Sequence, residues 1–110
     1  MKQYVIDELR LEDHEKIKSW MDENLERSPL GGLYWLPVDD SVLADLQREH
    51  SQCSPHVFAL ELTEERLSCE LLVRTKARVT CQCIAYATPG QTLWLMDRID
   101  EIFKETGTQN

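Results

Sequence analysis

HVFALEL (56–62), LSCELLVR (67–74) and VTCQCIAYA (79–87) decide the fold of this 110-residue chain. Apolar residues alternate with other residues along each stretch, which predicts three strands that share one apolar face. TEER (63–66) lies between the first two stretches and predicts a tight turn. We therefore expect an antiparallel meander with its apolar face turned inward.

The alternation also predicts the register of these strands, because a shift by one residue would turn every apolar side chain outward. The expected pairs of the first hairpin are Leu62–Leu67, Leu60–Cys69, Phe58–Leu71 and His56–Val73. In the second hairpin, Cys81 and Cys83 share the inward face with Cys69 only if the loop has an odd length of about three or five residues.

The flanking sequence predicts the remaining elements. We expect an edge strand over 3–9, a helix over 11–26 that Ser28-Pro29 ends, a short strand over 34–38, and a helix from Asp39 or Asp40 to about Cys53. Thr88, Pro89 and Gln91 predict a capping box at the start of a last helix, and Gly107 suits its end. The order β-α-β-α-β-β-β-α predicts a single α+β domain over 1–110, a two-layer sandwich with helices packed on one face of an antiparallel sheet.

Charge and composition exclude several classes of protein. Twenty acidic residues against 12 basic ones give a formal net charge of -8, which disfavours general binding to nucleic acid or to an anionic membrane. The first residues lack the apolar stretch of a signal peptide. We expect a cytoplasmic protein whose four cysteines stay reduced.

Cysteine and histidine form the main candidate site. His50, Cys53 and His56 follow one another at the end of the predicted second helix, and Cys81 and Cys83 are expected on one side of a strand. Cys69 is expected on the adjacent strand, close to that pair. If the helix packs on this face, these side chains could hold zinc or iron, or could act in redox chemistry.

The same residues also have an ordinary structural interpretation. The chain has no Cys-x-x-Cys pair, and Cys-x-Cys on a strand is a poor chelate without a turn that folds the thiolates together. Cysteine is common in cores as a small apolar side chain. From sequence we therefore favour core packing without a cofactor, and keep the metal or redox site as the alternative.

Partner binding is the other candidate activity. Tyr34, Trp35 and Leu36 follow a Gly-Gly loop, and an exposed aromatic there would suit a protein interface. A loop that folds back over an edge of the core is an equally good interpretation of these residues. Three basic residues at the tip between the second and third predicted strands are further candidate contacts. So is one aromatic residue outside the apolar face of the last predicted helix. These residues are Arg74, Lys76, Arg78 and Trp94.

Catalysis has little support from the sequence. The chain contains no Gly-x-Ser-x-Gly, His-Glu-x-x-His or phosphate-binding motif, and a Cys81 or Cys83 nucleophile with His56 would need an open cleft. We expect a non-catalytic binding or regulatory domain that acts through a protein partner or self-association, such as a dimer. A metal- or redox-binding protein is the alternative, and a cysteine enzyme ranks last.

Overall fold

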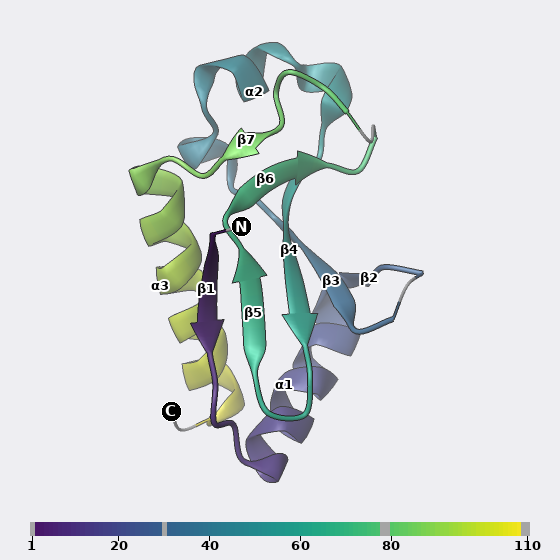
Figure 1. Ribbon diagram of the computed structural model, residues 1–110, viewed down its shortest axis with the longest axis vertical. Helices are drawn as coiled ribbons and strands as arrows, with labels where there is room; N and C mark the ends of the chain where they lie inside the picture. The colour runs from purple at the N-terminus through teal and green to yellow at the C-terminus, as the bar shows by residue number, and fades with distance from the viewer. Residues whose placement is uncertain (1, 30, 78–79, 109–110) are drawn as a thin grey trace.

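The computed structural model describes residues 2–29, 31–77 and 80–108 and has the predicted α+β fold (Figure 1). Its strands are β1 (Gln3–Ile6), β2 (Glu26–Arg27), β3 (Leu33–Pro37), β4 (His56–Leu62), β5 (Leu67–Glu70), β6 (Leu72–Thr75) and β7 (Ala85–Tyr86). Its helices are α1 (Leu11–Asn24), α2 (Asp45–Glu49) and α3 (Pro89–Thr106), with 3₁₀ turns η1 (Asp40–Val42) and η2 (Ser51–Cys53). None of these helices is both long and apolar enough to cross a lipid bilayer.

All strand pairs in the described residues are antiparallel. The order of the strands in the sheet is β1-β5-β4-β3-β2. β6 pairs with the first two residues of β4 on one side and with β7 on the other. β1 lies at the edge of the sheet, as expected. The predicted register of the first hairpin is confirmed near its turn, where Leu62 faces Leu67 and Leu60 faces Cys69.

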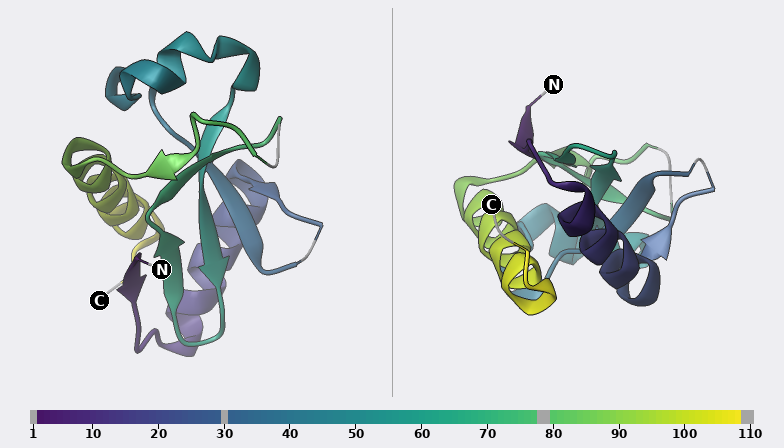
Figure 2. Two further views of the ribbon diagram at one scale, coloured as in Figure 1. Left: turned by 45° about the horizontal axis from the view of Figure 1, so that its top comes forward. Right: turned by 90° about the horizontal axis from the view of Figure 1, so that it is seen from below.

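The core lies between the sheet and the two long helices. α1 and α3 pack beside each other on the same face of the sheet (Figure 2). Fully buried side chains come from all three components: Ile17 and Met21 from α1, Leu95, Ile99 and Ile102 from α3, and Phe58, Leu60 and Leu67 from the sheet. Each such side chain contributes roughly 1.5–3 kcal/mol through removal of apolar surface from water. α2 lies beyond one end of this sandwich rather than over its face (Figure 1).

The ends of the long helices follow local chemistry. In the capping box of α3, Thr88 Oγ1 accepts from the Gln91 amide at 3.1 Å and Gln91 Oε1 accepts from the Thr88 amide at 3.0 Å, as predicted. Gly107 ends α3 with φ at 73°, a left-handed conformation that glycine adopts without strain. α1 ends at Asn24, earlier than expected, because the next residues pair with β3 as β2.

The predicted helix up to about Cys53 is wrong in its continuity. Leu43 and Ala44 have extended backbone angles, which separate η1 from α2, and His50 separates α2 from η2. The first two pieces have caps of their own: Asp39 accepts from the Ser41 amide at η1, and Gln47 Oε1 accepts from the Ala44 amide at α2. Local side-chain to backbone bonds thus compete with a continuous helix.

The predicted strand over 67–74 is interrupted at Leu71. The Leu71 amide donates to the carbonyl of Lys2, and the Leu71 carbonyl accepts from Ala87, so neither group bonds to β4. Pairing with β4 resumes in a shifted register, with His56 opposite Thr75 and Val57 opposite Arg74. The expected pairs Phe58–Leu71 and His56–Val73 are therefore wrong.

The third predicted strand, over 79–87, is the largest correction. Only Ala85 and Tyr86 pair with β6, and Val79 lies outside the described residues. The connection from β6 to β7 spans 76–84, much longer than the short loop expected from strand parity. Cysteines at alternate positions resemble the pattern of a half-buried strand, but here they flank a turn.

Candidate metal centre

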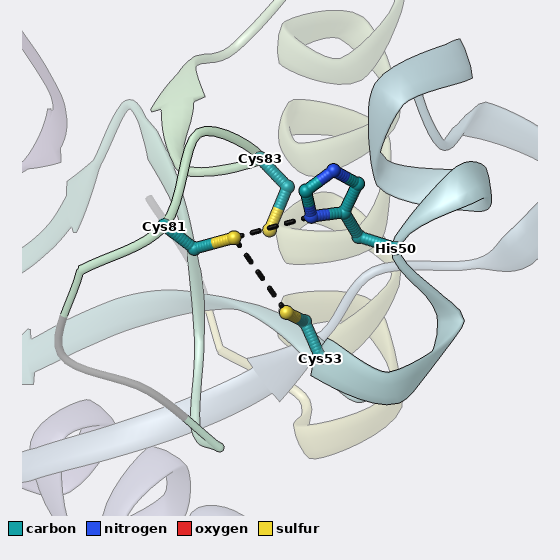
Figure 3. Close-up of side chains that lie close together, drawn as sticks. All are labelled: His50, Cys53, Cys81 and Cys83. Carbon is teal, nitrogen blue, oxygen red and sulfur yellow. Dashed lines mark hydrogen bonds between the residues drawn. The ribbon is translucent and has the colours of Figure 1, made fainter.

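Four sulfur and imidazole side chains converge at the end of the sandwich that carries α2 (Figure 3). They are His50, Cys53, Cys81 and Cys83, and their ligand atoms all lie within 4.8 Å of one another. His50 Nδ1 is 3.1 Å from Cys81 Sγ, and Cys53 Sγ is 3.7 Å from the same sulfur. All four cysteines of the chain are free thiols.

A tight turn positions the first pair of ligands. His50 follows the last residue of α2, and the Cys53 amide donates to the His50 carbonyl at 2.9 Å. This bond closes the His50-x-x-Cys53 turn, so both side chains leave it toward the same side (Figure 3). The two residues act as one chelating unit.

A second turn positions the other pair. The Ile84 amide donates to the Cys81 carbonyl at 3.1 Å, which folds the chain between Cys81 and Cys83. The sequence-based objection to a metal was that Cys-x-Cys on a strand cannot bring its thiolates together. That objection does not apply, because this segment is a turn and not a strand.

Buried hydrogen bonds fasten the two turns to each other and to the fold. Gln47 Nε2 donates to the Cys83 carbonyl at 3.3 Å, while Gln47 Oε1 accepts from Gln91 Nε2 at 2.8 Å. The Thr75 hydroxyl, on β6, donates to the Cys53 carbonyl. Gln47, Thr75 and Gln91 are all buried.

Sequence reasoning missed the role of Gln47 and Thr75. Gln47 lies three residues before His50, so both side chains fall on one side of a helix, and a glutamine at that spacing is the signal that could have found it. Thr75 carried no such signal, because its contact with Cys53 depends on the shifted register of β6.

Two thiols of the site have pKa values displaced in opposite directions. The pKa of Cys81 is lowered to about 6, first by the backbone amide of Cys83 and then by the Cys83 side chain, with smaller contributions from His50 and Cys53. Burial raises the pKa of Cys83, and its thiol neighbours raise it further. The thiolate is the form that binds a metal, so the lowered pKa of Cys81 favours binding, and a cation would favour ionisation of the other thiols.

Two separations within the group of four are close to those of a tetrahedral zinc site. Zn–S and Zn–N lengths of about 2.3 Å and about 2.0–2.1 Å imply ligand separations of about 3.8 Å between sulfurs and about 3.5 Å between sulfur and nitrogen. The Cys53–Cys81 separation is 3.7 Å and the His50–Cys81 separation is 3.1 Å. These two separations differ by less than about 0.5 Å from those expected around a bound ion, and the remaining ones lie within 4.8 Å.

The two other predicted ligands lie outside this group of four. His56 begins β4, and its Nε2 lies 3.4 Å from Cys83 Sγ. Burial lowers the pKa of His56, and the charge of His50 lowers it further. Cys69 lies between Tyr4 and Leu60 in the middle of the sheet, where burial raises the pKa of its thiol to about 12.

The expected proximity of Cys69 to the Cys81–Cys83 pair is wrong, because 81–83 does not form a strand beside β5. Cys69 instead has the packing role expected of an ordinary core cysteine.

Two of the predicted partner-binding residues are buried in the core. Tyr34 is 1% exposed and its hydroxyl donates to Asp22 at 2.6 Å, while Leu36 is 3% exposed. Both side chains point toward the helices because alternate residues of β3 face the core. They are therefore not surface contacts in this fold.

The other predicted partner-binding residues lie at separate places. Trp35 is half-buried on the opposite side of β3, and Trp94 is half-buried and stacks on Phe58 with ring centroids 6.2 Å apart. Arg74 pairs with Glu70, Lys76 pairs with Glu26, and Arg78 lies outside the described residues. A partner role for these residues stays a prediction.

A scan of family models and searches of curated proteins and of solved structures found no match to this chain. The geometry of its own residues is therefore what supports a function.

Proposed function

We propose that this protein is a zinc-binding domain in which His50, Cys53, Cys81 and Cys83 hold one Zn²⁺ ion. The observation that carries the proposal is the convergence of one imidazole and three thiol groups within 4.8 Å, from two turns far apart in the sequence. Three sulfurs and one nitrogen are a donor set that zinc prefers in structural sites.

The ion would have a structural role. Four protein ligands complete a tetrahedral shell, whereas a catalytic zinc keeps one position open for water or substrate. The ion would join the segment after α2 to the connection between β6 and β7, which no disulfide fastens. A structural ion leaves no open position for a substrate, so we retain the proposal that the domain works through a protein partner.

Metal analysis of the full chain tests this proposal. Protein purified under reducing conditions without chelator should contain about one zinc per chain, the stoichiometry of a single four-ligand site. Replacement of zinc by Co²⁺ should give the visible d–d absorption of tetrahedral cobalt and charge-transfer bands from thiolate. Zinc-free reduced protein that takes up neither ion would overturn the proposal.

Alanine variants of cysteines provide the matched comparison. Cys53→Ala and Cys83→Ala each remove a buried ligand and should abolish stoichiometric zinc binding. Cys69→Ala removes an equally buried thiol that lies outside the cluster, so it should keep the metal. Equal metal content in the three variants would contradict the assignment of ligands.

A redox dithiol is the second candidate function, favoured by the 3.7 Å separation of Cys53 and Cys81 Sγ. Two thiols at this distance can form a disulfide while hydrogen peroxide is reduced to two molecules of water. The S–S bond forms as the O–O bond breaks, and the two electrons and the two thiol protons pass to oxygen. A reversible Cys53–Cys81 disulfide in a protein that binds no metal would support this candidate over zinc. Mass spectrometry of peptides under non-reducing conditions distinguishes the two.

A further inference from the structure

His56 is the one histidine near the cluster that the zinc proposal does not use. Its side chain is 3% exposed, and Nε2 lies 3.4 Å from Cys83 Sγ. The other ring nitrogen, Nδ1, is buried and has no hydrogen-bond partner in the described part of the chain. A buried polar atom without a partner is uncommon and calls for a physical reason.

The environment of the ring favours one of its two neutral tautomers when a metal is bound. With the proton on Nδ1, a buried N–H would lack an acceptor, and the lone pair of Nε2 would face a metal-bound thiolate that has no proton to share. With the proton on Nε2, the ring donates to Cys83 Sγ, and only a lone pair is left unpaired at Nδ1. The proton on Nε2 thus removes both the repulsion between the Nε2 lone pair and the Cys83 thiolate and the buried Nδ1–H that lacks an acceptor.

We infer that His56 is a positioning residue of the metal centre, which donates an Nε2–H hydrogen bond to the Cys83 thiolate once the ion is bound. This inference rests on the proposed zinc site. Three thiolates and one neutral imidazole around a divalent cation leave one net negative charge. A donor to sulfur disperses that charge, keeps Cys83 in place and makes its sulfur a weaker nucleophile.

The hydrogen bonds around the cluster would then be shared between two sulfurs. Cys81 interacts with the backbone amide of Cys83, whereas Cys83 has the side chain of His56. His56 is fixed at the start of β4, where its carbonyl accepts from the Val38 amide at 2.9 Å. The donor thus belongs to the sheet and not to either chelating turn, which ties the orientation of Cys83 to the folded sandwich.

Two variants of His56, whose side-chain amide groups differ in length, test the inference. In His56→Gln the side-chain nitrogen can occupy the place of Nε2, whereas in His56→Asn it reaches only the place of Nδ1. The Kd for Co²⁺, measured by competition with a chelator, should rise about 10- to 100-fold in His56→Asn and stay close to that of the wild type in His56→Gln. Alkylation of Cys83 by iodoacetamide in the zinc-loaded protein should be faster in His56→Asn alone.

A remote histidine serves as the control. His14, on α1, contacts the Thr63 carbonyl through Nδ1, so His14→Gln should change neither quantity. Equal Kd values and equal alkylation rates in His56→Asn and His56→Gln would overturn the inference while leaving the zinc site intact. A wild-type chain that binds no Co²⁺ would instead overturn the zinc proposal itself.

Discussion

Replacement of Gln47 by alanine should weaken the whole domain, because this side chain joins three parts of the chain. The variant removes hydrogen bonds to the Ala44 amide, the Cys83 carbonyl and Gln91 Nε2. The last two bonds are buried, and each buried polar group left without a partner costs about 1–3 kcal/mol. Water can reach the part-buried Ala44 amide, which costs less. We expect a total loss of about 3–5 kcal/mol in the free energy of unfolding.

Urea unfolding of the zinc-free, reduced protein measures this loss, followed by circular dichroism. Gln52→Ala is the matched control: it changes the same residue type in the same segment, but Gln52 is exposed. The control should stay within about 0.5 kcal/mol of the wild type. A small protein has only about 5–15 kcal/mol of stability, so the Gln47 variant should be visibly marginal.

The opposite result would refute the reasoning about this network. If Gln47→Ala lost less than about 1 kcal/mol, the Cys83 carbonyl and Gln91 would not depend on Gln47 for their hydrogen bonds. The variant should also bind zinc more weakly than Gln52→Ala does, because it releases the turn that carries Cys83. Unchanged zinc affinity would mean that the ligand turns hold their positions without Gln47.

The remaining predictions concern pH, capping and metal. Lys18 and the Tyr34 hydroxyl lower the pKa of Asp22, so the unfolded chain binds the proton more tightly than the folded chain does. The contribution of Asp22 to stability is therefore present above about pH 4 and is lost as pH falls further. In urea titrations, Asp22→Asn should remove this pH dependence. Burial, followed by the hydrogen bond to Asp22, raises the pKa of Tyr34 to about 12. The contribution of Tyr34 to the free energy of unfolding is therefore complete below about pH 10 and is lost as pH rises through the folded pKa. Tyr34→Phe should reduce this loss of stability at alkaline pH. Thr88→Ala removes the cap of α3 and should cost about 1 kcal/mol in urea unfolding, while a cost near zero would show that the capping box is unimportant here. Free zinc at 100 times its Kd should raise the free energy of unfolding by about 2.7 kcal/mol, and a chelator should reverse the gain; no shift in the urea midpoint would contradict binding to the folded state.

Local patterns explain why much of the fold was predictable. The capping box at Thr88 and Gln91 needs only neighbouring residues, and the tight turn between β4 and β5 fixes the pairs nearest to it. The class of fold follows from amphipathic helices and an apolar sheet face that must cover each other. These features depend on short-range chemistry, so the sequence carries them directly.

One error arose where distant residues bond to the same backbone groups. Leu71 alternates like a strand residue, but Lys2 and Ala87 take its backbone hydrogen bonds and shift the register of β6. Cys81 and Cys83 also alternate like strand residues, but the chain turns between them. Periodicity reports which side chains avoid water, and a cysteine avoids water equally well in a core and beside a metal.

By itself, the sequence determined the α+β class, the two long helices, the caps of α3 and the six residues that include the candidate metal ligands. Only the tertiary structure decided which four of them meet, since His50 and Cys53 belong to one turn and Cys81 and Cys83 to another. It placed Cys69 in the core and His56 against one sulfur. The physical reason is that a metal centre requires ligands a few ångströms apart in space, and spacing along the chain fixes that distance only within a single turn.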